Sequence, residues 1–128
     1  MKNYTFARLD SNERVEFKEL LGLSGCEISL NTLPAGVSVP FVHAHKQNEE
    51  VYIVLEGSGK LFIDGEEIAI AKGDIFKIDP SGERCISAGD EAIRFLCIQV
   101  KAGSLEQYTD TDGVLREGIK PSWLFNVK

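Results

Sequence analysis

Turn-forming residues interrupt the middle of this chain at intervals of about eight to twelve residues. The clearest turns are Pro-Ala-Gly at residues 34–36, Glu-Gly-Ser-Gly at 56–59, Asp-Gly at 64–65 and Asp-Pro-Ser-Gly at 79–82. The segments between them are rich in β-branched and apolar side chains, which favour strands. The Asp-Gly pair separates two apolar runs and is a strong hairpin signal. This spacing predicts an all-β fold of the sandwich or barrel kind.

The two ends of the chain carry weaker signals. Residues 15–17 and 27–33 are also predicted as strands, with a turn or half-helix between them at 19–22, and the last clear strand is expected at about 92–100. Beyond that strand the composition becomes more polar, and a short helix is expected to begin with Ser104 as its N-cap. We therefore expect a barrel followed by a tail that is irregular or briefly helical.

The chain has 128 residues, of which 43% are hydrophobic and 27% are charged. These values are typical of one globular domain that buries a core without disulfides. We expect a single domain over residues 1–128, with the barrel at about 27–100 and the tail at 101–128.

The formal net charge is −6, and the acidic side chains are dispersed along the chain. Nucleic acids and anionic membranes both bind to basic patches, so neither is an expected partner. The chain has three cysteines, Cys26, Cys85 and Cys97. An odd number of cysteines without a CxxC motif favours a reducing compartment. The N-terminus lacks the pattern of a signal peptide, and no apolar run approaches membrane-spanning length. The sequence therefore predicts a cytoplasmic protein.

The only two histidines of the chain, His43 and His45, are separated by one alanine. Glu49 and Glu50 follow them, just before an apolar run at residues 51–55. Residues i and i+2 of a strand point to the same face, so the two imidazoles can converge with a carboxylate on one point. Such a set of side chains favours a divalent metal ion.

The spacing around these histidines resembles the first sequence motif of the cupin family, which consists of a glycine, His-x-His, a glutamate and a second glycine. In this chain those positions are occupied by Gly36, His43, His45, Glu50 and Gly57. Four residues separate His45 from Glu50 and six separate Glu50 from Gly57, as in the family, whereas the first interval is one residue longer than usual. Several spacings that agree are more specific than any one of them alone.

Gly73, Pro80 and Gly82 resemble the second cupin motif, again with one extra residue before the proline. The family usually follows this last glycine with a histidine, which is the fourth metal ligand, and then with an asparagine. Here those two positions hold Cys85 and Gly89. Cys85 is either a thiolate ligand, which would favour zinc or iron, or a small apolar side chain in the interior.

The resemblance covers about residues 32–100 and is strongest to the small single-domain cupins with a conserved barrel. It implies a double-stranded β-helix, or jelly-roll, barrel with a divalent metal ion inside. His43, His45 and Glu50 would hold that ion and leave positions open for substrate or dioxygen. This set suits non-haem iron, although zinc, manganese and nickel are chemically possible. Glu49 is the alternative carboxylate, but only Glu50 keeps both family spacings.

Three further side chains are candidates for lining the pocket: Phe41, Tyr52 and Gln99. The resemblance implies a metal-dependent enzyme that acts on a small molecule, either an oxygenase or a sugar-type isomerase. The missing fourth histidine supports an alternative, a non-catalytic cupin that binds or senses a small molecule through a degraded metal site. A storage or structural role is the third hypothesis.

The apolar run at residues 51–55 is hydrophobic on both faces of its predicted strand. A strand with this pattern needs cover on both sides. The barrel interior covers one face, and the N-terminal strands, the C-terminal tail or a second subunit can cover the other. We predict a homodimer that covers Val51, Ile53 and Leu55 or the face around them.

Overall fold

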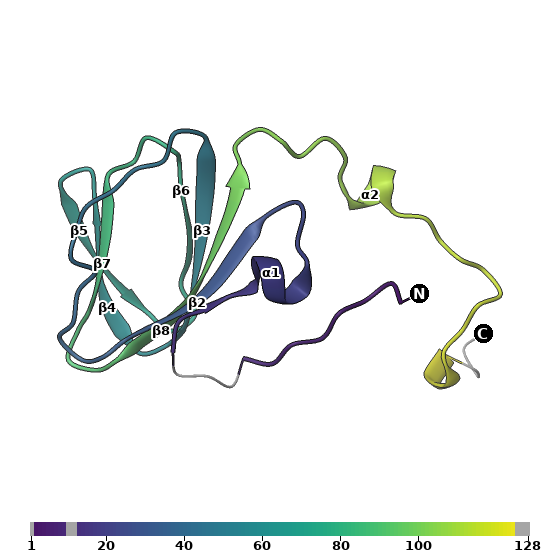
Figure 1. Ribbon diagram of the computed structural model, residues 1–128, viewed down its shortest axis with the longest axis horizontal. Coiled ribbons are helices and arrows are strands. Elements are labelled where there is room, and N and C mark those ends of the chain that lie inside the picture. The colour runs from purple at the N-terminus through teal and green to yellow at the C-terminus, as the bar shows by residue number, and fades with distance from the viewer. Residues whose placement is uncertain (1, 10–12, 125–128) are drawn as a thin grey trace.

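A computed structural model describes residues 2–9 and 13–124, which fold mainly into two antiparallel sheets (Figure 1). The larger sheet has the strand order β1 (Val15–Glu16), β2 (Glu27–Leu33), β8 (Ile93–Lys101), β3 (Asn48–Glu56) and β6 (Ile75–Ile78). The smaller sheet has the order β5 (Glu66–Ala71), β4 (Ser58–Ile63) and β7 (Arg84–Ala88). The described residues also form the helices α1 (Phe17–Leu21) and α2 (Thr109–Asp112) and the 3-10 helix η1 (Ser122–Leu124). None of these helices is long and apolar enough to cross a membrane.

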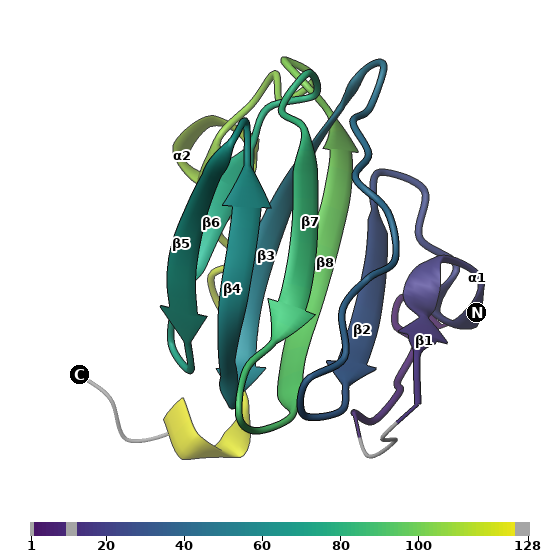
Figure 2. The same ribbon diagram turned by 90° about the vertical axis from the view of Figure 1, so that its left-hand side faces the viewer.

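The two sheets face each other, with the smaller one in front in Figure 2, and the core lies between them. Side chains alternate across each strand, so every second residue points inward. Tyr52 and Val54 of β3 are buried on the larger sheet, and Leu61 of β4 and Ile86 of β7 are buried on the smaller one. The all-β prediction is confirmed, and the strands form a double-stranded β-helix barrel.

Two of the predicted turns show why the chain bends where it does. Asp64 and Gly65 join β4 to β5 with φ values of 48° and 87°, and a type I′ hairpin turn requires positive values at both positions. Gly57 joins β3 to β4 with a φ of 82°, and a Cβ at this position would lie 1.8 Å from the carbonyl oxygen of Ala92. The glycine at position 57 is therefore required both for its backbone conformation and for its lack of a side chain.

We expect Gly57→Ala to lower the free energy of unfolding by about 2–4 kcal/mol, because alanine combines a strained backbone with a clash against Ala92. Gly65→Ala is the matched control, since its φ is also positive but a Cβ there has no atom within 4 Å. Its expected cost is only about 1 kcal/mol. Urea denaturation of both variants measures the difference, and equal losses would contradict the role given to the close approach of Ala92.

The N-terminal prediction needs one adjustment. The strand expected at residues 15–17 ends at Glu16, because Phe17 begins α1 and is buried. The half-helix expected at 19–22 is α1 itself, which ends at Gly22 in a left-handed conformation. Phe17 is thus the buried residue of the helix rather than the last residue of the strand.

The helix expected from Ser104 is wrong. Residues 104–108 have no regular structure, and α2 begins only at Thr109. Gly103 has a φ of 75°, and the Ser104 N–H donates to the carbonyl oxygen of Lys101 at 3.2 Å. These features form a turn at the end of β8, which prevents Ser104 from capping a helix.

The C-terminal tail leaves the barrel in Figure 1 and runs away from both sheets. Its large apolar side chains are mostly exposed, including Leu115 at 90% and Trp123 at 80%. Phe125, which the sequence groups with Trp123, lies outside the described residues. Within the described part of the tail, these side chains are not buried against the barrel.

Candidate metal centre

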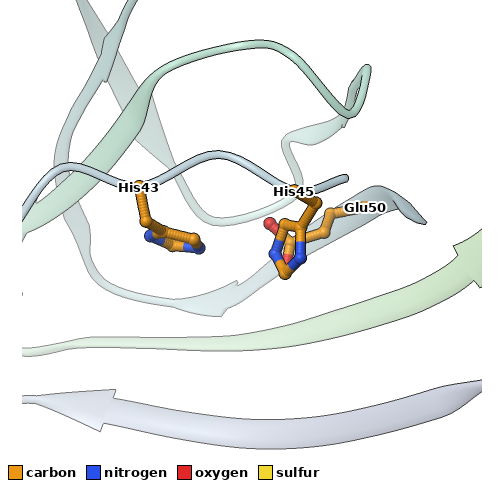
Figure 3. A group of neighbouring side chains, drawn as sticks. All are labelled: His43, His45 and Glu50. Carbon is orange, nitrogen blue, oxygen red and sulfur yellow. The ribbon is translucent and has the colours of Figure 1, made fainter. Parts of the chain in front are cut away.

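His43, His45 and Glu50 lie together inside the barrel. Glu50 belongs to β3, and the two histidines belong to the extended segment that leads from β2 into β3. The potential ligand atoms of the three side chains all lie within 4.8 Å of one another. Both imidazoles project to the same side of their segment, with the Glu50 carboxylate beside His45 (Figure 3). The structure therefore brings together the three residues that the spacing predicts as a group.

The histidine segment is held by backbone hydrogen bonds to the chain around β7. The His43 N–H donates to the carbonyl oxygen of Arg84 at 3.1 Å, and the Arg84 N–H donates back at 3.0 Å. The His45 N–H donates to the carbonyl oxygen of Pro80 at 2.8 Å. The segment was predicted as a strand but forms only an isolated bridge at His43, because its next partner, Pro80, lies in a turn. Extended backbone alone suffices to place both rings on one side.

Glu50 is 2% exposed, and both of its carboxylate oxygens have protein partners. Oε1 accepts hydrogen bonds from the Tyr52 hydroxyl at 2.7 Å and from Arg84 Nη1 at 2.5 Å. Oε2 accepts one from the Cys97 thiol at 3.3 Å and lies 3.2 Å from His45 Nε2. Burial acts to raise the pKa of Glu50, but the hydrogen bonds from Tyr52, Arg84 and Cys97 outweigh it, and the pKa lies below its ordinary value of 4.5. The carboxylate is therefore ionised at neutral pH.

Arg84 is a central residue of the site that the sequence reasoning missed. It is 1% exposed and lies directly opposite His43, so its side chain points to the same face. Its Nη2 donates to the carbonyl oxygens of Asp79 at 2.8 Å and Pro80 at 3.1 Å, and its Nε donates to that of Gly82 at 3.0 Å. The guanidinium is thus fully desolvated, and hydrogen bonds to Glu50 and to the preceding turn hold it.

Strand periodicity could have located Arg84. Residues 84, 86 and 88 share one face of β7, and a large apolar residue such as Ile86 favours the interior, which places Arg84 inside as well. Counting along the family motif points instead to Cys85, one residue later. The alternation of buried and partly buried residues along β7 shows that Arg84 and not Cys85 faces the core.

Cys85 is not brought into the group of potential ligands among the described residues. Its thiol donates to the carbonyl oxygen of Val39 at 3.2 Å and lies 3.7 Å from the Ser38 hydroxyl. It lines part of the adjoining cavity, but its sulfur is engaged with the neighbouring chain segment. The prediction of Cys85 as a fourth ligand is therefore not supported by its placement.

The ring nitrogens of the two histidines fit a metal ion. Among the described residues, His43 Nδ1 and His45 Nε2 are buried and lack any hydrogen-bond partner. Burial is the main reason that the pKa of His43 lies below its ordinary value of 6.5, which favours the neutral, metal-binding form of the ring. Two imidazole nitrogens that make no hydrogen bond, one of them 3.2 Å from the ionised Glu50 carboxylate, form a donor set suited to a divalent transition metal. Glu49, the alternative carboxylate, lies opposite Val100 in the register of β3 with β8. It is not a member of this group of potential ligands.

Cys97 also belongs to the site, although the sequence reasoning treated it as structural. It lies on β8 two residues before Gln99, on the same face of the strand, and its thiol contacts Glu50. Since Gln99 was predicted to line the pocket, the same periodicity could have placed Cys97 there.

We expect Cys97 to resist alkylation in the folded protein while Cys26 and Cys85, which are only partly buried, react. Burial raises the pKa of Cys97 to about 12, which leaves little thiolate at pH 8. Mass spectrometry after iodoacetamide treatment at pH 8 measures the labelling of each cysteine, and the same reaction in urea is the control. Native labelling of Cys97 as fast as that of Cys26 would contradict this placement.

The three donors lie in the wall of a cavity of about 430 Å³. This cavity is also lined by the three side chains that the sequence suggested for the pocket, which are Phe41, Tyr52 and Gln99. The Tyr52 ring stacks on Phe76 with centroids 5.2 Å apart, while its hydroxyl reaches Glu50. The cavity is large enough for a small organic molecule next to the donor set.

Comparison with known proteins identifies the family. Residues 29–99 match Cupin_2, the cupin domain family. A crystal structure of a cupin protein from Bacteroides fragilis is 56% identical in sequence, with a TM-score of 0.88 and coverage of 91% of this chain and 99% of that chain. This chain belongs to the cupin family.

Two further relatives are more distant. A putative sugar phosphate isomerase from Acidithiobacillus ferrooxidans is 27% identical, with a TM-score of 0.62 and coverage of 69% of this chain and 58% of that chain. An uncharacterized protein of Methanocaldococcus jannaschii is 35% identical over 66 residues, which are 51% of this chain and 52% of that protein. The chain thus spans about half the length of the curated relative it matches.

Proposed function

We propose that this cupin binds a divalent metal ion through His43, His45 and Glu50 and acts on a small molecule in the adjoining cavity. The observation that carries this proposal is the pair of buried imidazole nitrogens that lack hydrogen-bond partners beside an ionised carboxylate. A bound metal ion would supply Lewis-acid or redox chemistry at the coordination positions that three protein ligands leave open. The chain itself supplies the three donors and the adjoining cavity.

Of the two reactions considered from the sequence, the cavity favours an oxygenase. A proton-transferring isomerase needs a base in addition to the ligands of the metal. Among the described residues that line the cavity, Glu50 is the only carboxylate, and it already belongs to the donor set. The 27% identity to a putative sugar phosphate isomerase keeps isomerisation as the second reaction to test.

The test is metal reconstitution followed by two activity screens. Protein purified without a metal-affinity tag is loaded with iron(II) under anaerobic conditions, and oxygen consumption is measured with a panel of small organic substrates. Zinc- or manganese-loaded protein is screened in parallel with sugars and sugar phosphates, and His45→Ala is the control in both screens. We expect oxygen uptake that depends on iron and on His45. A fully loaded protein that turns over nothing in either screen would contradict an enzymatic role.

A specific observation favours a second candidate, a metal-independent binding protein. Both oxygens of Glu50 already accept hydrogen bonds from protein donors, namely Tyr52, Arg84 and Cys97, so the carboxylate is stable without a metal ion. Native mass spectrometry distinguishes the two candidates. A retained organic molecule without metal would favour the binding protein, and stoichiometric metal would favour the enzyme.

We further propose that the protein forms a homodimer through the outer face of the larger sheet. The strand register aligns Leu96, Ile53 and Ile75 across β8, β3 and β6 on that face. Leu96 and Ile53 are partly buried, whereas Ile75, on the edge strand, is 66% exposed. A second copy would bury this apolar row and protect the free edge of β6.

We expect Ile75→Glu to shift the protein toward monomer in sedimentation velocity at micromolar concentration, because it places a charge in the proposed interface. Ile68→Glu is the matched control, since Ile68 is an exposed residue of β5 in the other sheet. A wild-type protein that sediments only as a monomer would contradict the proposed dimer.

A further inference from the structure

The C-terminal tail carries a series of large apolar side chains that the rest of the described chain leaves in solvent. Six large apolar side chains between residues 105 and 124 are at least 70% exposed, and they are Leu105, Tyr108, Val114, Leu115, Ile119 and Trp123. A segment that stays in solvent normally has few aromatic and β-branched side chains, because it has no surface to bury them on. The composition of the tail therefore indicates a segment that packs against a surface.

The outer face of the larger sheet is an apolar surface that the described chain covers at one end only. One row across this face consists of Leu30 on β2, Leu96 on β8, Ile53 on β3 and Ile75 on β6. Leu30 is 0% exposed, and α1 lies beside β2 on this side of the sheet (Figure 1). Ile75, at the other end of the row, is 66% exposed. Within the described residues, the face thus lacks cover toward β6.

The tail begins at this same sheet and projects on the side of its outer face. It follows directly after β8, which ends at Lys101. In Figure 1 the smaller sheet lies on the left, whereas the tail extends to the right of the larger sheet. The tail does not lie on its own sheet, since its apolar side chains are exposed. A second copy on this face would lie on the side to which the tail projects.

The tail is also long enough to cross a neighbouring sheet. Residues 105–124 can span at most about 70 Å when extended. A strand of nine residues, such as β8, rises only about 30 Å. The apolar side chains of the tail are spread over most of its length, from Leu105 to Trp123. They can therefore contact several strands of another copy.

We infer that the tail is an arm that packs on the outer face of the larger sheet of a second copy, so that two copies exchange their tails. This inference rests on the proposed homodimer and names the segment that holds it together. Two-fold symmetry makes the exchange reciprocal, because each copy supplies one tail and one face. Tyr108 and Trp123 can each bury about 150–250 Å². With four aliphatic side chains beside them on each of two tails, the contact reaches the range of about 1,200–2,000 Å² that stable complexes bury.

The fluorescence of Trp123 tests this inference, because it is the only tryptophan of the chain and reports on the tail alone. Emission wavelength and quenching by acrylamide are measured for wild type from micromolar concentration down to dilutions at which sedimentation velocity shows monomer. N-acetyltryptophanamide is the reference for an exposed ring. We expect the dimer to emit at shorter wavelength and to be quenched less than the monomer and the reference, because the partner buries the ring. A dimer whose Trp123 is quenched as strongly as the reference would overturn the inference.

Leu115→Glu tests the arm in a second way, through the dimerisation constant measured by sedimentation. We expect this variant to dimerise at least about a hundredfold more weakly than wild type, because two-fold symmetry removes the buried side chain twice. Gln107→Glu is the matched control, since it adds the same charge to the same tail but replaces an exposed polar side chain. It should stay within about fivefold of wild type. Circular dichroism checks that both variants are folded.

The outcomes separate this inference from the proposed dimer, and none of the measurements depends on a bound metal ion. A dimer that Leu115→Glu leaves as tight as wild type would overturn the inference alone. A wild type that is monomeric at every concentration would contradict both. Equal burial of Trp123 in monomer and dimer would place the tail on its own barrel and also overturn the inference. If Leu115→Glu does not fold, the fluorescence of wild type decides.

Discussion

Replacing His45 with alanine is expected to weaken zinc binding by more than about a hundredfold. Removal of a group that merely supports a metal ligand already costs about ten- to a hundredfold in affinity, so loss of a direct ligand costs more. His45 Nε2 has no hydrogen-bond partner among the described residues and lies 3.2 Å from Glu50 Oε2, so its removal leaves two of the three donors. Isothermal titration calorimetry of protein purified without a metal-affinity tag measures the change.

Cys85→Ser is the matched control for this prediction. The Cys85 thiol donates to the Val39 carbonyl oxygen, and serine can make the same contact, so zinc affinity should stay within about threefold of wild type. A large loss in this variant would make Cys85 a ligand and would contradict its placement outside the group. No loss in His45→Ala would remove the basis of the metal proposal.

The second large effect concerns stability. Arg84→Ala is expected to lower the free energy of unfolding by about 3–5 kcal/mol, because it leaves the buried carboxylate of Glu50 without its positive partner. Arg84 and Glu50 are 1% and 3% exposed at their side chains, and the Arg84 side chain also satisfies carbonyl oxygens of the preceding turn. For a chain of this size, the midpoint temperature of thermal denaturation should fall by roughly 10–20 °C.

Two comparisons isolate the buried pair. Arg14→Ala removes an arginine whose pair with Glu16 is exposed at both side chains, so it should cost less than about 1 kcal/mol. The double variant Glu50→Leu with Arg84→Met removes both buried charges and should recover most of the lost stability. If the double variant is no more stable than Arg84→Ala, the loss comes from packing and backbone contacts rather than from an unpaired charge.

The effect of Arg84 on stability should also depend on pH. The folded-state pKa of Glu50 lies below its ordinary value of 4.5. The ionised carboxylate therefore stabilises the fold above pH 4.5, and this stabilisation is lost as the pH falls through the folded-state pKa. The difference in stability between wild type and Arg84→Ala should therefore narrow on acidification below pH 4.5. A difference that stays constant down to pH 2 would contradict the charge pairing.

Local chemistry explains why much of the fold could be predicted. Asp64 and Gly65 form the expected hairpin, because few other dipeptides adopt positive φ at two successive positions. The helix predicted from Ser104 failed for a related reason, since a serine that can cap a helix can also follow a glycine in a turn. Turn residues with a unique conformational requirement are informative, and residues that suit several conformations are not.

The candidate site also has one part that the sequence predicts and one part that it does not. His43, His45 and Glu50 are close in sequence, so extended backbone and a short connection almost suffice to bring them together. Arg84 is 34 residues from Glu50, and its place beside the carboxylate depends on the pairing of β7 with the histidine segment. A shift of one residue in that pairing would have turned Cys85 inward instead.

The sequence by itself determined the β architecture and the convergence of two imidazoles with one carboxylate, because both follow from turn chemistry and the two-residue period of strands. Only the tertiary structure decided which charge lies next to that carboxylate. Strand periodicity could place Arg84 on the inner face of β7, but its neighbour there depends on the register between distant segments, which is set by packing of the whole core. That register places the Arg84 guanidinium beside Glu50, whereas the family pattern had pointed to Cys85, either as a thiolate ligand or as a small apolar side chain.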